Sequence, residues 1–144
     1  MQSIQLTPYL NFDGTCEEAM NFYARVFQAP FVGTLTRMKD VPGATGLQPE
    51  WENRVVNVGL ALGNQILMGS DILPSMGDKF VVGDNQYIHI TAPSRETADR
   101  WAAELADGGL VEMPMADQFW GDYYGSLKDR YGTCWMISHN PQRQ

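Results

Sequence analysis

The chain has 144 residues, of which 44% are hydrophobic, 19% charged and 11% aromatic, and it carries a formal net charge of -7. This length and balance indicate one globular domain, and they exclude both two full enzyme domains and a disordered chain. Because the net charge repels phosphate backbones and anionic lipid surfaces, we expect neither nucleic acid nor a membrane as a partner.

Two cysteines, Cys16 and Cys134, are too few for a disulfide framework, so free thiols in a reducing compartment are expected. The first eight residues form neither a basic nor an apolar leader, and the sequence has no apolar run of about 18 residues. We therefore expect a soluble, cytoplasmic protein.

The first half of the chain begins with a strand-like segment at 3–12, followed by a helix that starts at Thr15. Thr15 and Glu18 have the spacing of a capping box, in which each side chain bonds a helix amide that would otherwise lack a partner. The apolar stripe of this helix is Ala19, Phe22, Tyr23, Val26 and Phe27. Strand-like segments follow at 31–38, 54–62 and 65–70, and Gly63-Asn64 favours a tight hairpin between the last two.

The second half repeats this order. A strand-like segment at 86–92 precedes a helix that starts at Ser94 and stops at Gly108-Gly109, and further strand-like segments lie at 110–115, 123–128 and 133–139. The apolar stripe of the second helix is Ala98, Trp101, Ala102, Leu105 and Ala106. Each of these positions lies 79 residues after its counterpart in the first helix, which indicates a duplicated unit.

We therefore predict an α+β fold in which two βαβββ modules form a curved, mainly antiparallel sheet. One helix covers only one face of its own sheet, so the modules must pack together, with the helices on the outer face and a concave cavity on the other. The predicted single domain spans 1–144, with module 1 at about 1–71, a linker at about 72–85 and module 2 at about 86–140. We expect surface loops at 39–53 and 72–85.

The sequence has no glycine-rich phosphate loop and no G-x-S-x-G nucleophile motif. Its two histidines differ in setting. Alternation along Tyr87-Ile88-His89-Ile90-Thr91 places Ile88 and Ile90 toward the helix and turns His89 to the other face, where it could be a metal ligand, a general base or a satisfied polar group. His139 is expected to be solvated. A Cys134–His89 thiol pair is conceivable.

Six aromatic residues gather between positions 119 and 135. Trp120 precedes a strand, where its indole could wall a pocket and donate its N–H to a ligand, or simply pack in the core. Among the acidic residues, Asp129 is expected to accept backbone amides at a turn. Glu112 is either a solvated edge residue or a buried, functional carboxylate.

The paired βαβββ halves, Phe22-Tyr23, and Asp129-x-x-Gly132 resemble the vicinal oxygen chelate superfamily of glyoxalase I, extradiol dioxygenases and bleomycin-resistance proteins. Within it the chain is most similar to the PhnB-like branch, through Pro8-Tyr9, Leu67-Met68-Gly69-Ser70-Asp71, Phe119-Trp120-Gly121 and Gly132-x-x-Trp135-Met136. Some members of that branch carry a ubiquinone-methyltransferase label, but this chain has no glycine-rich turn of the kind that nucleotide-derived methyl donors commonly use.

The resemblance implies a divalent metal held by His, Glu or Gln from four strand positions. Counting from the shared motifs, these positions fall on Pro8, on Leu67 or Met68, on His89 and on Met136. One ligand of four survives, so no metal or other cofactor is expected. A divalent metal held by His89 with Asp71 or Glu112 is the alternative.

The same counting implies that one concave face carries the ligand pocket. The predicted pocket residues are Leu10, Met68, Ser70, Tyr87, His89, Thr91, Trp120, Cys134, Met136 and Ser138. This mostly apolar lining favours a small-molecule-binding protein without a complete metal site. The alternative is a metal-dependent or His-based lyase, isomerase or dioxygenase-type enzyme, with His89 and Glu112 as candidate catalytic residues. The resemblance also implies a homodimer, with modules paired within one chain or exchanged between two.

Overall fold

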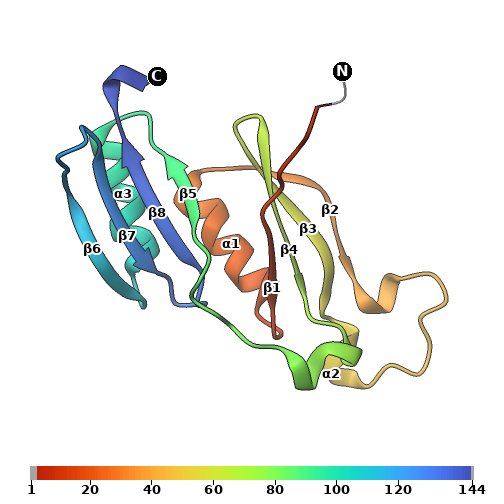
Figure 1. Ribbon diagram of the computed structural model, residues 1–144. Coiled ribbons are helices and arrows are strands. Elements are labelled where there is room, and N and C mark those ends of the chain that lie inside the picture. The colour runs from red at the N-terminus through yellow and green to blue at the C-terminus, as the bar shows by residue number, and fades with distance from the viewer. Residues whose placement is uncertain (1–2, 144) are drawn as a thin grey trace. The chain divides into compact units, whose positions relative to one another are not determined.

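A computed structural model describes residues 3–143 (Figure 1), and these divide into two compact units at the boundary between Phe80 and Val81. Each unit is described by itself. In each, a strand and a helix are followed by three further strands, and the four strands form one sheet. The predicted α+β fold with two βαβββ modules is therefore confirmed.

Unit 1 is built from β1 (Tyr9–Phe12), α1 (Cys16–Phe27), β2 (Phe31–Arg37), β3 (Val55–Leu62) and β4 (Gln65–Asp71), with the short helix α2 (Pro49–Glu52) in the connection between β2 and β3. The strands lie in the order β1-β4-β3-β2. β1 is parallel to β4, and the other neighbours are antiparallel. β1 is shorter than the predicted segment 3–12, because Pro8 has no N–H to extend the ladder.

Unit 2 has the same topology. It is built from β5 (Ile88–Thr91), α3 (Arg95–Ala106), β6 (Leu110–Asp117), β7 (Tyr123–Lys128) and β8 (Cys134–His139), in the order β5-β8-β7-β6. β5 is parallel to β8, and the remaining pairs are antiparallel. No helix within residues 3–143 has the length and apolar character needed to span a membrane.

The first helix is capped differently from the prediction. The Thr15 side chain makes no capping hydrogen bond, so the capping-box prediction is wrong. Asp71, at the end of β4, takes that role: its Oδ1 accepts the N–H groups of Gly14 (2.9 Å) and Cys16 (3.0 Å), and its Oδ2 accepts the N–H of Val55 (2.9 Å). A buried carboxylate from a distant strand thereby ties the start of α1 to the sheet. The second helix does begin as predicted, because Ser94 Oγ accepts the N–H of Thr97.

The core of unit 2 lies between α3 and its sheet, where Trp135 and Ile137 are fully buried. Asp129 accepts the N–H groups of Tyr131 and Thr133 with Oδ1, as predicted for a turn residue, and its Oδ2 also accepts the Trp135 indole N–H at 2.9 Å. The prediction that His139 is solvated is wrong. Its ring is buried, and its Nδ1 lies 2.9 Å from the Ala92 carbonyl oxygen. This contact arises because β8 runs parallel to β5 and brings His139 beside Ala92, the residue that follows β5.

Candidate functional site

The face of the unit 2 sheet that lies opposite α3, here called the open face, carries most of the predicted pocket residues. Residues directly opposite each other in a ladder share a face. His89 pairs with Met136, and Thr91 pairs with Ser138. His89 and Thr91 are exposed, whereas the alternate residues Ile88 and Ile90 pair with the buried Trp135 and Ile137 on the helix side.

The neighbouring strand β7 extends this face. Tyr124, Ser126 and Lys128 pair with Ser138, Met136 and Cys134 respectively. These β7 residues are absent from the predicted pocket, because the sequence of one strand does not reveal its register against the next. Two positions along a strand span about 6.6–6.8 Å, so the rows that begin at Cys134, Met136 and Ser138 cover roughly 13 Å along the face.

The His89 imidazole has a defined partner. Its Nε2 lies 2.9 Å from Ser138 Oγ, and its ring lies edge-on to Tyr124 with 6.5 Å between the ring centroids. The proposed Cys134–His89 pair is therefore replaced by a His89–Ser138 pair. The pKa of the Cys134 thiol is raised, mainly by burial and to a lesser extent by nearby carboxylates, so the reactive thiolate is disfavoured.

Aromatic rings continue from His89 toward the hairpin that joins β6 and β7. The Tyr124 and Trp120 ring centroids lie 5.9 Å apart, and those of Trp120 and Phe119 lie 5.0 Å apart, both edge-on. We call Phe119, Trp120, Tyr124 and His89 the aromatic row. Phe119 is 97% exposed and Trp120 44% exposed, so the outer end of the row is open to solvent.

The Trp120 indole does not offer its N–H to a ligand as predicted. Nε1 already donates to Asp122 Oδ2 at 2.9 Å, and Asp122 Oδ1 accepts the Asn140 side-chain N–H at 2.7 Å. An indole has one donor, so this bond uses it fully. The role left to Trp120 is a ring surface held in a fixed orientation.

Tyr87 and Glu112 form a second polar pair on unit 2. The Tyr87 hydroxyl donates to the Glu112 carboxylate, with Oε1 at 3.0 Å and Oε2 at 3.1 Å. Both residues are exposed, so Glu112 is a solvated carboxylate and not a buried one. The hydrogen bond to Glu112, followed by burial, raises the pKa of Tyr87 above its usual value.

In unit 1, the sheet face opposite α1 carries Met68 and Ser70, which pair with Tyr9 and Asn11 of β1. Ser70 Oγ donates to Asn11 Oδ1 at 3.1 Å. Leu10 is not on this face. It pairs with Gly69, where an added Cβ would meet Met20 and Cys16 of α1, so Leu10 faces the helix and its predicted place in the pocket is wrong.

The cause is one residue between strand and helix. Tyr9 holds the position opposite Met68 that His89 holds opposite Met136. Seven positions separate Tyr9 from Cys16 at the start of α1, whereas six separate His89 from Arg95 at the start of α3. The offset of 79 that matches the helices therefore fails by one in the strands, and a shift of one residue exchanges the two faces.

This register also corrects the first predicted metal position, Pro8, to Tyr9. The four strand positions then carry Tyr9, Met68, His89 and Met136. Thioether sulfur is a soft ligand, unlike the His, Glu or Gln donors of the superfamily, so these residues do not fit its divalent ion. Within residues 3–143, no three His, Cys, Asp or Glu side chains gather to hold a metal.

Asp71 does not fit the alternative metal site with His89. Its carboxylate is 4% exposed and accepts three backbone N–H groups, so binding a metal would uncap α1. Glu112 is accessible to solvent, and both of its carboxylate oxygens lie within hydrogen-bond distance of the Tyr87 hydroxyl, which donates to them.

Comparison with known proteins gives one family and one fold. A family model described as 3-demethylubiquinone-9 3-methyltransferase matches residues 4–138. The Escherichia coli protein YjdN is 30% identical over 142 residues, covering 92% of this chain and 93% of YjdN. A Bacillus cereus structure described as a putative 3-demethylubiquinone-9 3-methyltransferase, PhnB protein, has a TM-score of 0.73 at 27% identity and covers 94% of this chain and 99% of that one. A glyoxalase/bleomycin resistance protein/dioxygenase family structure from Burkholderia phytofirmans shares the fold, with a TM-score of 0.65 at 12% identity over 92% of this chain and 95% of that one.

Proposed function

Because the chain belongs to the PhnB-like family described as 3-demethylubiquinone-9 3-methyltransferase and has the fold of glyoxalase-related structures, we propose that it binds a small, planar aromatic molecule on the open face of unit 2. The observation that carries this proposal is the aromatic row, whose rings follow one another at 5.0, 5.9 and 6.5 Å between centroids. Rings at these spacings offer edges and faces against which a planar ligand gains contact area.

The rigidity of Trp120 supports this reading. The hydrogen bonds from Trp120 to Asp122 and from Asn140 to Asp122 hold the hairpin tip, so the indole loses little conformational freedom when a ligand binds. At the inner end of the row, the His89–Ser138 pair supplies both a donor and an acceptor for a hydroxyl or carbonyl group. The ligand class that matches is an aromatic ring with a polar substituent.

The proposal includes no metal and no other cofactor, because the four strand positions lack the donor atoms that a divalent ion requires. It also includes a homodimer in the cytoplasm and excludes nucleic acid as a partner. The net charge of -7 supports the exclusion of nucleic acid. The free, buried Cys16 and Cys134 support a reducing compartment such as the cytoplasm.

A second candidate function is proton transfer by His89 in a lyase or isomerase reaction. The observation that favours it is the hydrogen bond to Ser138, which fixes the orientation of an exposed imidazole. In such a reaction His89 would be the base and Ser138 a positioning residue. Glu112 is the weaker candidate, because it is exposed to water and already accepts the Tyr87 hydroxyl.

The binding proposal is tested by calorimetric titration with 2-naphthol and naphthalene, two planar probes that differ by one hydroxyl. We expect Trp120→Ala to weaken both at least about tenfold, since aromatic contacts contribute about 0.5–1.5 kcal/mol beyond the area they bury. His89→Ala should weaken 2-naphthol more than naphthalene, because it removes a hydrogen-bonding group as well as one ring of the aromatic row. Trp51→Ala, which removes an indole of unit 1, is the matched control and should leave both affinities unchanged.

Equal affinity of the wild-type and Trp120→Ala proteins for both probes would refute the proposed site. Metal analysis of the purified protein tests the metal-free part separately: a stoichiometric divalent ion that disappears in His89→Ala would contradict it. Turnover of a 2-naphthol-like substrate, lost in His89→Ala and slowed in Ser138→Ala with a shifted pH profile, would favour the second candidate.

A further inference from the structure

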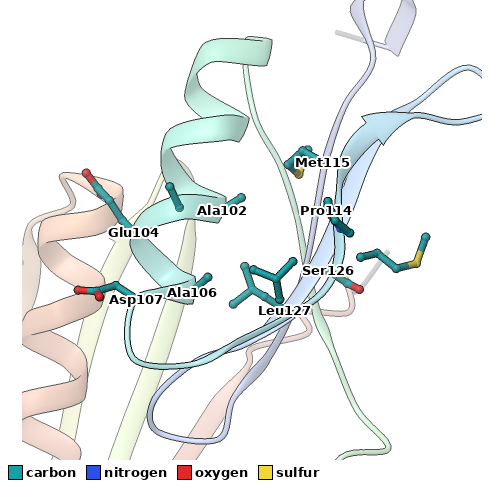
Figure 2. A pocket seen from close by; sticks show the side chains of 11 residues that line it. Ala102, Glu104, Ala106, Asp107, Pro114, Met115, Ser126 and Leu127 are labelled. Atoms are coloured by element: carbon teal, nitrogen blue, oxygen red, sulfur yellow. The ribbon is translucent and has the colours of Figure 1, made fainter.

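Unit 2 contains a second candidate pocket, whose lining shares Ser126 with the open face. It lies on the helix side of the sheet, between α3, β6 and β7, and has a volume of about 640 Å³ (Figure 2). Its apolar lining includes Ala102, Ala106, Val111, Met113, Met115 and Leu127. In Figure 2, Ala102 and Ala106 lie on α3 across the pocket from Met115 and Leu127.

The repeat explains why this space is unfilled. Ala102 and Ala106 of α3 correspond to Tyr23 and Phe27 of α1, 79 residues earlier in helices of equal length. The Tyr23 side chain is fully buried in unit 1. Unit 2 therefore lacks two aromatic rings at helix positions where unit 1 has them.

The other positions of the apolar stripe keep their apolar character, although the buried Cys16 and Met20 of α1 correspond to the exposed Arg95 and Asp99 of α3. Ala19 and Ala98 are both fully buried at equivalent positions, as are Val26 and Leu105 with at most 2% exposure. Ala102 and Ala106 are thus the two stripe positions at which α3 has a small side chain where α1 has an aromatic ring. Val111 and Met113 are 50% and 42% exposed, so the space is an open groove that a ligand can enter from solvent. A mostly apolar groove of this size is typical of a ligand site.

The charges at the pocket indicate an uncharged ligand. Glu104 and Asp107 are the acidic residues that line it. Glu104 Oε2 lies 3.2 Å from Arg100 Nη1, and Asp107 Oδ2 lies 3.0 Å from Arg130 Nη2, so each carboxylate already has a cationic partner. The remaining lining gives an ionised ligand no partner, and burying an unpaired charge is costly.

We propose that this pocket binds an uncharged, apolar molecule with two aromatic rings, which occupy the space that Tyr23 and Phe27 fill in unit 1. Met113 and Met115 suit such a ligand, because unbranched thioether side chains adapt to the outline of a ring and contact its edge favourably. This site is independent of the aromatic row, and its ligand needs no polar substituent.

The test is a fluorescence titration of the full chain with N-phenyl-1-naphthylamine, a neutral two-ring probe that brightens in apolar surroundings. Because the aromatic row is itself proposed to bind naphthyl rings, all variants are titrated in the Trp120→Ala background, where we expect saturable binding at one probe per chain. The double variant Ala102→Tyr, Ala106→Phe, which copies unit 1, should bind at least about tenfold more weakly while its thermal midpoint stays equal or rises. Met113→Glu, at a 42% exposed position, should weaken binding similarly without refilling the core.

Two controls separate this site from the open face. Glu96→Tyr adds a ring to an exposed position of α3 outside the pocket lining and should keep the affinity of the background protein for the probe. Trp120→Ala alone, which removes a ring of the aromatic row, should retain one probe site per chain. Undiminished binding to the double variant and to Met113→Glu overturns the proposal, as does binding that is lost in Trp120→Ala. Absence of binding to the wild type overturns it as well, and a dimer that Met113→Glu dissociates would then identify a second copy as the occupant.

Discussion

Asp71 allows a sharp test of how unit 1 is held together. In Asp71→Ala, the N–H groups of Cys16 and Val55 lose their acceptor in buried surroundings, and that of Gly14 loses it near the surface. Each of the two buried N–H groups left without a partner costs about 1–3 kcal/mol, whereas the Gly14 N–H can turn to water. We therefore expect a loss of about 2–6 kcal/mol in the free energy of unfolding.

Two further variants make the reasoning refutable. Asp71→Asn keeps one oxygen for the helix amides but sets an amide group against the Val55 N–H, and should cost about half as much. Thr15→Ala should cost less than about 0.5 kcal/mol, although Thr15 occupies the cap position, because its side chain makes no cap bond. Urea unfolding followed by tryptophan fluorescence measures all three. A Thr15→Ala cost equal to that of Asp71→Ala would show that the carboxylate does not cap α1.

Three more predictions concern single groups. Glu112→Gln should lower the pKa of Tyr87 toward 10.0, because the hydrogen-bonded carboxylate that opposes the phenolate is gone. Ultraviolet titration measures this pKa, with Tyr87→Phe as the control. An unmoved pKa would disprove the Tyr87–Glu112 pairing in solution. Burial, with Asp71 and Glu17, raises the pKa of Cys16 to about 12 from 9.0, so stability present below pH 9 should decline as the pH rises from 9 toward 12, at no more than about 1.4 kcal/mol per pH unit. Unfolding measured at pH 8 and 10.5 should show a smaller decline in Cys16→Ala than in the wild type. Gly109→Ala places a Cβ 2.2 Å from the Lys128 carbonyl oxygen and should lower the free energy of unfolding by more than about 2 kcal/mol. Gly83→Ala, whose Cβ has its nearest neighbour at 3.7 Å, should have little effect. Equal unfolding midpoints of the two variants would show that the backbone at Gly109 yields.

The fold could be predicted because its signals are local. Apolar spacing in the two helices, and the same order of strands after each, depend only on neighbours in sequence. The start of the helix at Ser94 was predictable for that reason, since Ser94 caps it by accepting the N–H of Thr97, three residues later. The cap of α1 was not, because Asp71 reaches it from more than fifty residues away.

The candidate site was less predictable, since it depends on register. His89 could be assigned to a face from its own strand, whereas Tyr124 joins the aromatic row only through the pairing of β7 with β8. The predicted face of Leu10 is wrong because the offset of 79 residues comes from the helices, whereas the strand positions Tyr9 and His89 lie 80 residues apart. His139 appeared solvated because its burial comes from its position beside Ala92, which proximity to the C-terminus does not reveal.

The single extra residue between β1 and α1 has a consequence for how duplicated halves can diverge. An insertion or deletion of one codon in that connection leaves the helix, its stripe and the strand order intact, yet it replaces every side chain that β1 carries on the face opposite α1 with one from its helix side. Tyr9 and Asn11 face outward today, and loss of one residue near Asp13-Gly14 would present Leu10 in their place. One indel in such a connection can therefore exchange a polar sheet face for an apolar one, a change that point substitutions would need several steps to achieve.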